Sequence, residues 1–394
     1  MDNSKCILAI NGGSSSIKFG LYQKNGKELI RILNGKVDGI GSVNGQLQYT
    51  DKSNQTDVIN LNASNYDSTV NFLSDWLEKQ KEHKNIEAIG HRIVYGMYHT
   101  EPEIITEKLL QELQKMSIYD PTHMPNEITL IETFRRRYSK LLQVACFDTS
   151  FHSTLPRKAY LLPLPRKFDQ KGVRRYGFHG ISYSYLLEEL SIQLGSIIKE
   201  KKIIIAHLGN GASLAAVKDG KCIDTSMSFT PCAGLPMGTR SGDLDPGIAW
   251  HIIMNEHLTP KQFYHMVNQE SGLLGISETS ADMRILLNKQ HSDIRASEAI
   301  EVFCYQTSKW IGAYAAALGG LDILVFSGGI GENIPEIRKS ICQNLRFLGI
   351  ELDERKNSKN AVNISSGSAT VDIRVIPTNE EAMIVKMVED KLKH

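Results

Sequence analysis

Residues 7–26 read ILAINGGSSSIKFGLYQKNG, and this stretch decides the fold class. The apolar run 7–10 and the apolar alternation 17–22 predict two strands. Residues 11–16 (NGGSSS) predict a polar, glycine-rich turn between them, and the K-N-G-K sequence at 24–27 is typical of a tight hairpin turn. The predicted order is therefore strand, loop, strand, turn.

Residues 203–221 (IIIAHLGNGASLAAVKDGK) repeat this order. An apolar strand again leads into a polar glycine loop, a second strand and a K-D-G-K turn. The letters N-G-x-S also recur, at Asn11–Ser14 and at Asn210–Ser213. The repetition predicts two homologous α/β halves that face each other across a cleft.

Further elements are predicted between and after these two stretches. Apolar residues at helical spacing predict helices over 66–80 and 297–318, and residues 322–326 predict a buried strand. Pro335 suits the first turn of another helix, and the last helix is expected to begin near Thr378. The chain therefore alternates strands and helices, as α/β proteins do.

The composition of the 394 residues bounds the classes of function. An apolar share of 41% and a charged share of 23% are ordinary for a globular protein, and the length suggests two to three domains. Lys and Arg number 45 and Asp and Glu 44, so the formal charge is +1 and no basic excess points to a nucleic acid or a membrane surface.

The termini and the cysteines suggest a cytoplasmic protein. Residues 1–10 lack the pattern of a secretory signal, and no run approaches the ~20 apolar residues of a membrane helix. The six cysteines form no C-x-x-C pair, so neither a zinc site nor a disulfide framework is predicted.

Three glycine-rich loops are each predicted to follow an apolar, strand-like run. They read NGGSSSIK, HLGNGAS and SGGIGEN and begin at Asn11, His207 and Ser327. Glycine lets backbone N–H groups approach a phosphate, the hydroxyls of Ser14 and Ser16 add donors, and Lys18 adds a charge. A single loop of this kind is an ordinary turn, but three in one chain indicate phosphate binding. None matches a P-loop or a dinucleotide fingerprint, which disfavours both folds.

Four charged or titratable side chains fall at positions suited to a site. Arg240 lies among small residues in a loop, where its guanidinium can bind a carboxylate or phosphate with two N–H groups. Arg92 and Asp148 each lie near a strand end, where sites of α/β sheets gather. His179 lies between glycines. Each also has a structural interpretation: a surface ion pair for the arginines, a turn or cap for Asp148, and packing for the histidine.

Two adjacent carboxylates open the last predicted helix. Thr378-x-x-Glu381 fits a capping box, which gives Glu381 a structural role. Glu380 is the freer carboxylate.

These blocks, in this order, resemble the acetate kinase family, of the superfamily that includes sugar kinases, heat-shock ATPases and actin. The resemblance covers essentially the whole chain. The residues that carry it are N-x-G-S-S-S-x-K at 11–18, H-R-x-V at 91–94, F-D-T-x-F-H at 147–152, R-R-Y-G-F-H-G at 174–180, H-L-G-N-G at 207–211, D-T-S-M at 224–227, F-T-P at 229–231, M-G-T-R-S-G-D-x-D-P at 237–246, G-G-I-G-E-N at 328–333 and P-T-N-E-E at 377–381.

The resemblance implies two duplicated ribonuclease-H-like (actin-like ATPase) domains around a central cleft, usually in a homodimer. It implies an acyl- and metal-binding half at 1–150 plus 377–394 and a nucleotide-binding half at 151–376. The implied reaction is reversible transfer of the γ-phosphoryl group of ATP to a short-chain carboxylate, with Mg²⁺ or Mn²⁺ as the ion.

The resemblance also implies roles for individual residues. Asn11 and Glu380 would hold the metal, directly or through water. Asp148 would orient the acid or act as acid/base, and His179 and Arg240 would stabilise the transferring phosphoryl group. The carboxylate would be bound by Arg92, and its apolar tail would meet Val94, Thr122 and Pro231. ATP would contact Lys18, His207, Leu208, Gly209, Asn210, Gly211, Asp282, Met283, Arg284, Gly329, Ile330, Gly331, Glu332 and Asn333.

The chemistry suits these residue types. A carboxylate is already ionised at neutral pH, so the difficulty is to bring two anions together rather than to remove a proton. Cations and backbone donors answer that need, and a positioning role for Asp148 is more natural than a base role.

Several positions depart from the family pattern. The usual A-P-L-H-N-P-A-N is here Asp120–Glu127, with Thr122 in place of an apolar pocket residue. Tyr95 stands where histidine is common, and Tyr183 where H-G-T-S-H ends in histidine. Acetate is the leading substrate and propionate its competitor, because one methylene in an apolar pocket is worth only ~1–3 kcal/mol.

Two other classes of function stay open on the sequence. An ATP-binding clamp of the same superfamily would need the phosphate loops but not the cations Arg92, His179 and Arg240 together. A sugar kinase would need a general-base aspartate and a polyol pocket.

Overall fold

The computed structural model describes residues 5–13, 15–26 and 28–393 and divides the chain into two compact units. Unit 1 comprises residues 1–150, 180–185 and 379–394, and unit 2 comprises 151–179 and 186–378. Ser14, an expected phosphate donor, lies outside the described residues. No helix of the described residues has both the length and the apolar character needed to cross a membrane.

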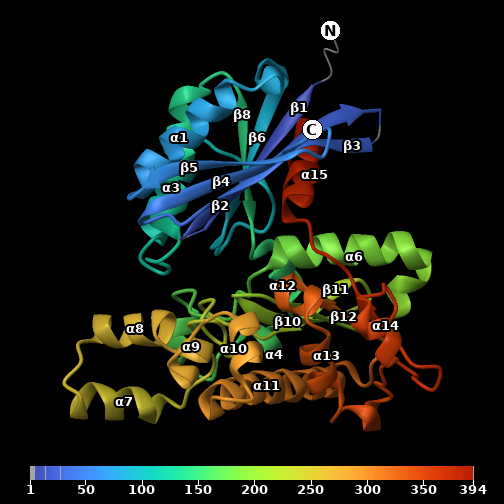
Figure 1. Cartoon of the computed structure of the whole chain (residues 1–394). Helices are drawn as coiled ribbons and strands as arrows, with labels where there is room; N and C mark the ends of the chain where they lie inside the picture. Colours follow the sequence, from blue (N-terminus) through green and yellow to red (C-terminus); the bar gives the residue numbers. More distant parts are fainter. Residues whose placement is uncertain (1–4, 14, 27, 394) are drawn as a thin grey trace. The chain divides into compact units, whose positions relative to one another are not determined.

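Unit 1 is built on an eight-stranded sheet in the order β5-β4-β3-β2-β1-β6-β8-β7 (Figure 1). Strands β1 to β5 form an antiparallel meander, and β6 and β8 run parallel to β1. The strands are β1 Cys6–Gly12, β2 Ser16–Asn25, β3 Glu28–Asp38, β4 Ser42–Asp51, β5 Thr56–Ala63, β6 Ile86–Ile93, β7 Glu103–Ile104 and β8 Leu142–Phe147.

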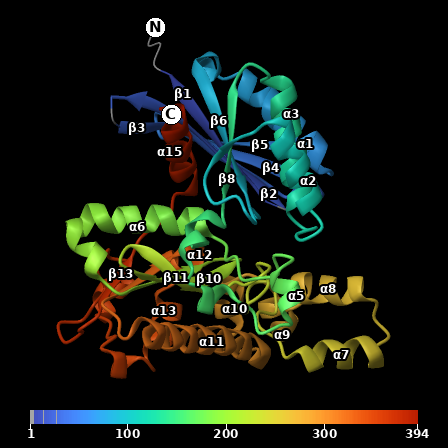
Figure 2. The ribbon, with the colours of Figure 1, turned by 180° about the vertical axis from the view of Figure 1, so that it is seen from behind.

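Helices pack on both faces of this sheet (Figure 2). Helices α1 and α3 bury Val70, Leu73 and Phe134 against alternate residues of β1 and β2. Helix α15 packs Ile384 and Val388 on the other face, against β1, β6 and β8. The helices are α1 Tyr66–Glu78, α2 Glu107–Met116, α3 Met124–Arg137 and α15 Glu380–Leu392, with the short 3₁₀ helix η1 Lys81–Asn85. Because both faces are covered, β1 is buried along its whole length.

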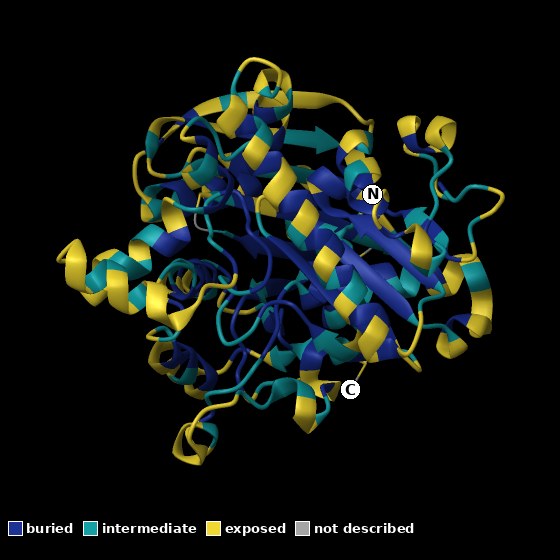
Figure 3. Ribbon diagram, turned by 90° about the horizontal axis from the view of Figure 1, so that it is seen from below, coloured by how far each residue is buried: buried dark blue, intermediate teal, exposed yellow. Residues whose placement is uncertain are grey.

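Unit 2 is built on a five-stranded sheet in the order β11-β10-β9-β12-β13. Strands β9, β10 and β11 are antiparallel, and β12 and β13 continue parallel to β9. The strands are β9 Ile203–Leu208, β10 Ala212–Lys218, β11 Lys221–Thr225, β12 Ile323–Ser327 and β13 Asp372–Val375. Figure 3 shows central strands as continuously buried and the outer turns of helices as exposed; in this sheet β9, β10 and β12 are the buried strands.

The remaining helices belong to unit 2, except that α6 begins within unit 1. They are α4 Arg157–Tyr160, α5 Arg166–Asp169, α6 Gly180–Leu194, α7 Pro246–Asn255, α8 Pro260–Gln269, α9 Gly272–Ser277, α10 Met283–Lys289, α11 Ile294–Leu318, α12 Gly328–Asn333, α13 Pro335–Cys342 and α14 Glu354–Ser358, and the 3₁₀ helices are η2 Ser150–Thr154, η3 Gly195–Glu200 and η4 Arg346–Leu348.

The two sheets share one topology, which confirms the predicted duplication. In unit 1 the strands β3-β2-β1-β6-β8 have the same order and directions as β11-β10-β9-β12-β13 in unit 2. The repeated letters N-G-x-S do not occupy equivalent positions, however. Asn11 lies within β1 opposite Lys18, whereas Asn210 lies in the loop between β9 and β10.

Two local predictions are wrong. The glycine-rich SGGIGEN is not a loop, because residues 328–333 form the short helix α12 directly after β12. The last helix is not capped by Thr378: Asn379 is the N-cap, and its side chain accepts the N–H of Ala382 at 3.0 Å. Glu381 is thereby released from the capping role expected for it.

The other predicted elements are confirmed with small shifts at their ends. Helix α1 ends two residues before the predicted limit, at Glu78. Helix α11 begins earlier than predicted, at Ile294, because the Asp293 side chain accepts the N–H of Arg295 and caps it. Strand β12 covers the predicted apolar run.

Candidate active site

In unit 1, two parallel strands end side by side and bring Arg92 to Asp148. Arg92 is the penultimate residue of β6, and Asp148 directly follows β8. Nε and Nη2 of Arg92 both donate to Oδ2 of Asp148, at 3.0 and 2.6 Å, and Nη1 donates to the Gly12 carbonyl at 3.4 Å. Asp148 also accepts the N–H of Ile181 at 3.4 Å. The guanidinium is therefore fixed in orientation at the carboxyl ends of three strands.

The charged groups at this strand end strongly influence one another's pKa values. Burial alone opposes charging of Arg92, but the carboxyls of Asp148, Glu380 and Glu127 outweigh it and raise the pKa of the guanidinium. Burial also raises the pKa of Asp148, which the Arg92 charge only partly offsets. One buried cation is thus surrounded by three carboxyl groups.

Asn11 joins the two carboxylates that open α15. Its Nδ2 donates to Oε2 of Glu380 at 2.6 Å and to Oε1 of Glu381 at 3.1 Å. The amide oxygen and the carboxylates of this trio are the ligand types that Mg²⁺ prefers. The described residues hold no group of three or more His, Cys, Asp or Glu side chains suited to a metal. Mg²⁺ is usually bound by one or two carboxylates and completes its shell with water and phosphate oxygens.

Glu127 is a buried carboxyl that the sequence did not single out. It lies in the first turn of α3, 1% exposed, and its two oxygens are 3.2 and 3.1 Å from the N–H of Val94. Val94, two residues after Arg92, is buried. The signal available in the sequence was a single acidic residue at the start of an amphipathic helix, which does not reveal its partner.

Thr122 and Lys18 lie elsewhere on unit 1. Thr122 is half-buried just before α3, and its N–H donates to Oδ1 of Asp120 at 3.3 Å. Lys18 is exposed on β2, opposite Asn11 in the register. It lines a surface pocket of about 250 Å³ together with Arg31 and Lys36.

In unit 2, the loop between β9 and β10 brings several predicted residues together. Gly209 donates its N–H to the Gly211 carbonyl at 3.0 Å, which closes a tight loop. A Cβ on Gly211 would stand 3.3 Å from Nε2 of His179 and 3.7 Å from Nη1 of Arg240. Glycine at this position therefore lets the side chains of His179 and Arg240 approach the loop backbone.

His179 is held by neighbours on the same hairpin. Its Nδ1 lies 2.8 Å from the hydroxyl of Ser213, and its ring centroid is 4.4 Å from that of His207. His207 and Ser213 are register partners in β9 and β10. His179 itself adopts a left-handed backbone with φ of 58° at the start of α6. The sequence placed Ser213 in the glycine-rich loop HLGNGAS. Its contact with His179 was not predicted.

Arg240 is fixed by the loop that precedes α7. Its Nη1 donates to the Pro231 carbonyl at 3.1 Å, so the predicted pocket residue Pro231 contacts Arg240 through its backbone. In the same loop the Gly238 N–H donates to the Asn210 carbonyl at 3.0 Å. The Arg240 loop and the β9–β10 loop are thus linked directly.

The remaining predicted nucleotide residues differ in their exposure to solvent. Gly329 at the start of α12 lies close to Gly209, and Asn333 at its end is exposed. Leu208, Ile330 and Met283 are buried, so only their backbone is available to a ligand.

Three of the predicted nucleotide residues are engaged within the protein. Oε1 of Glu332 accepts the N–H groups of Gly328 at 2.8 Å and of Thr378 at 3.1 Å. Arg284 forms a bidentate ion pair with Asp282, at 3.1 and 2.6 Å, on the exposed surface of α10.

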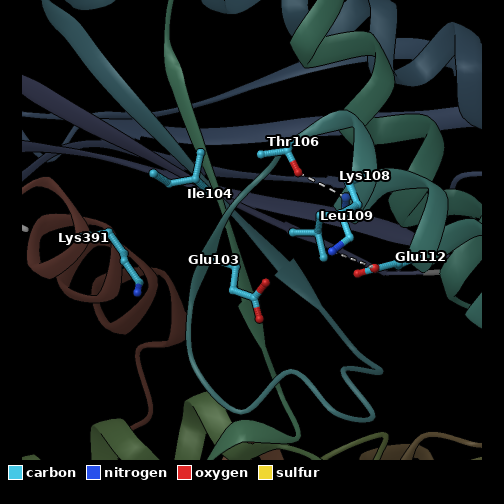
Figure 4. A pocket seen from close by; sticks show the side chains of 7 residues that line it. All are labelled: Glu103, Ile104, Thr106, Lys108, Leu109, Glu112 and Lys391. Carbon is cyan, nitrogen blue, oxygen red and sulfur yellow. Dashed lines mark hydrogen bonds and ion pairs between the residues drawn. The ribbon is translucent and has the colours of Figure 1, made fainter.

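A further pocket of unit 1 lies apart from these residues (Figure 4). It has a volume of about 310 Å³ and contains none of the predicted site residues. Its lining is Glu103, Ile104, Thr106, Lys108, Leu109, Glu112 and Lys391.

Comparison with known proteins agrees with this architecture over the full length. The sequence profile of the acetokinase family matches residues 6–386. The acetate kinase of Halothermothrix orenii is 40% identical over 390 residues, which cover 96% of this chain and 98% of that protein.

Two solved structures resemble the whole chain. A propionate kinase from Francisella tularensis subsp. tularensis superposes with a TM-score of 0.90 at 37% identity, covering 97% of this chain and 98% of that chain. An acetate kinase from Porphyromonas gingivalis superposes with a TM-score of 0.86 at 33% identity, covering 99% of each chain.

The protein is an α/β phosphotransferase of duplicated topology that uses a carboxyl group as acceptor. The predicted actin-like fold class is confirmed. The chain belongs to the acetokinase family.

Proposed function

We propose that the protein transfers the γ-phosphoryl group of ATP to acetate, giving acetyl phosphate and ADP. The observation that carries the proposal is Arg92, a guanidinium held at a strand end two residues before the buried apolar Val94. A guanidinium next to a small apolar surface suits a carboxylate with a short tail. The acetate kinase relatives support the same substrate.

The proposal assigns binding of the acid and the metal to unit 1, with the predicted limits 1–150 and 377–394. Arg92 binds the carboxylate, while Val94 and Thr122 line the space for its methyl group. Asp148 keeps the guanidinium in place through two N–H contacts on one oxygen. It has no proton to remove from an acetate ion, so its task is positioning.

Nucleotide and phosphoryl contacts are assigned to residues 151–376. The β9–β10 loop offers the backbone N–H groups of Asn210 and Gly211, and Lys18 adds a charge for phosphate. His179 and Arg240 flank this loop and would neutralise the oxygens of the transferring phosphoryl group. Pro231 contributes to the acyl pocket in the same proposal.

Mg²⁺ would be held by Asn11 and Glu380, whose oxygens fit its preferences. When bound, the ion neutralises phosphate charge, which is the main electrostatic need of phosphoryl transfer. Mn²⁺ has the same ligand preferences and is the alternative ion.

Propionate is the second candidate substrate. Thr122 places a hydroxyl and a methyl group where the family usually has an apolar residue, and the superposed propionate kinase supports this reading. A difference of one methylene is worth only about 1–3 kcal/mol, so both acids are expected to react.

A hydroxylamine trap for acyl phosphate tests the proposal, with ATP and Mg²⁺ and with formate, acetate, propionate and butyrate as acceptors. The expected signal peaks at two or three carbons and collapses in Arg240→Ala. Arg295→Ala is the matched control, because Arg295 lies in unit 2 on the exposed surface, paired with Glu278. No signal with any acid, while ATP still binds, would instead support an ATP-binding clamp, and turnover of a sugar would support a sugar kinase.

The proposal also includes a cytoplasmic homodimer. All six cysteines are free, which suits a reducing compartment. Light scattering coupled to gel filtration tests the dimer.

A further inference from the structure

The balance of charge around Arg92 raises a problem for a site that binds an anion. Asp148, Glu380 and Glu127 all act on the single guanidinium. The substrate would bring a fourth carboxylate to the same place. If all three protein carboxyls were ionised, their excess negative charge would oppose its binding.

The three carboxyls differ in the hydrogen-bond donors or cations that offset their negative charge. Oδ2 of Asp148 accepts two N–H groups of Arg92, at 3.0 and 2.6 Å, which favours its ionised form. Glu380 belongs to the proposed magnesium set, where an ion meets its charge. Glu127 accepts only the backbone N–H of Val94, with both oxygens near it. A single neutral donor compensates the charge of a buried carboxylate poorly, which favours the protonated form.

The surroundings of Glu127 also favour the neutral form. Charged and titratable groups face it from each packed segment: Arg92 on β6, Asp148 after β8, Asp120 before α3 and Tyr66 on α1. Only Arg92 among them is a cation. Burial is the main cause that raises the pKa of Glu127 to about 8, and the charges of Asp120 and Asp148 add to it against Arg92 and the Val94 N–H.

We propose that Glu127 has to be protonated for the site to bind its carboxylate substrate, so that acid binding takes up a proton wherever Glu127 would otherwise be ionised. Protonated Glu127 leaves the field of Arg92 available to the acid, and ionised Glu127 competes with the acid for it. This inference rests on the proposed function and adds a pH-sensitive control to the same site.

The kinetic test measures KM for acetate and for ATP as a function of pH. In the wild type, KM for acetate should rise up to about tenfold between pH 7 and pH 9, as expected for one group of pKa about 8. Glu127→Gln keeps the shape and one acceptor oxygen but cannot ionise, so its KM for acetate should lack this rise. KM for ATP should not show the difference, because ATP is assigned to other residues.

Glu132→Gln is the matched control, since Glu132 lies on the same helix but is exposed. It should follow the wild-type profile. The same rise of KM for acetate in Glu127→Gln as in the wild type would overturn the inference.

An infrared measurement tests the proton without turnover. The carbonyl stretch of a protonated carboxyl should be present in the wild type and in Glu132→Gln at pH 7, absent from Glu127→Gln, and lost from the wild type at high pH. Absence of that band from the wild type at pH 7 would overturn the inference even if Glu127→Gln failed to fold. If the proposed function is wrong, no acyl phosphate forms, whether or not the infrared band is present. The two failures can therefore be told apart.

Discussion

Replacing Glu127 by glutamine should change how the stability of unit 1 depends on pH. The carboxyl is 1% exposed, and its pKa rises from 4.5 to about 8 in the folded chain, chiefly through burial. Between these two values the native state therefore binds more protons than the unfolded state. Stability falls as pH rises in this window, which is the reverse of the behaviour of an ion-paired carboxylate.

The size of the effect follows from the two pKa values. Linkage of one proton gives a loss of about 2.5 kcal/mol in the free energy of unfolding between pH 5 and pH 7. Glu127→Gln removes this contribution, because the amide does not titrate. The difference in unfolding free energy between Glu127→Gln and the wild type should therefore move in favour of the variant by about that amount over this interval.

Urea unfolding followed by Trp76 fluorescence measures the effect in the right part of the chain. Trp76 is the tryptophan of unit 1 and is buried against Phe19 and Tyr49, whereas Trp250 and Trp310 belong to unit 2 and can be replaced by phenylalanine. Equal pH slopes in the wild type and in Glu127→Gln would refute the assignment of a raised pKa to Glu127.

Three further changes test unit 2. Ser213→Ala removes the hydroxyl that holds His179 at 2.8 Å, and kcat should fall about three- to tenfold with KM for ATP unchanged in steady-state kinetics, as loss of one hydrogen bond predicts. Arg338→Met removes a fully buried guanidinium whose N–H groups all meet neutral oxygens, and thermal unfolding should show a loss of about 3 kcal/mol or more. Gly238→Ala places a Cβ against Oδ1 of Asn210, and KM for ATP should rise about tenfold, or about 1.4 kcal/mol; an unchanged KM would remove the Asn210 loop from the nucleotide site.

The sequence predicted the hairpins because their signals are local. An apolar run, a glycine turn and a second apolar run are sufficient to define β1–β2 and β9–β10, and the order of elements predicted the duplication. The strand ends that carry Arg92 and Asp148 followed from the same patterns.

The short helix α12 could not be predicted because side chains satisfy the hydrogen-bonding groups at its two ends. Glycine is a poor helix former, so residues 328–333 read as a loop. In the structure Glu332 folds back to accept the Gly328 N–H, and Arg338 from the next helix donates to the carbonyls of Gly331 and Glu332. These contacts satisfy the helix ends through side chains whose partners are not visible in the sequence.

Glu127 was missed for a related reason. Helix α3 (Met124–Arg137) was not among the predicted helices, and the sequence does not say which strand end a polar residue on its buried face will meet. The partner, the Val94 N–H, lies 33 residues earlier. A buried carboxyl of this kind is recognised only when the packing of α3 on the sheet is known.

The duplicated topology explains why the two half-sites are chemically different yet built alike. In each hairpin the pair next to the closing pair includes residues of the proposed site: Asn11 opposite Lys18 in unit 1, and His207 opposite Ser213 in unit 2. The hairpin of unit 1 thus presents an amide and a lysine at this position. The hairpin of unit 2 presents His207 and Ser213, which both contact His179.

Each unit also uses a glutamate to fix the backbone that follows its central parallel strand. Glu127 accepts the Val94 N–H after β6, and Glu332 accepts the Gly328 N–H after β12. The two environments differ, because Glu332 also accepts the N–H of Thr378 while Glu127 faces the carboxyls around Arg92. The device of unit 1 is therefore expected to be sensitive to pH, and a Glu332→Gln variant, which changes the device of unit 2, should leave the pH dependence of KM for acetate as it is in the wild type.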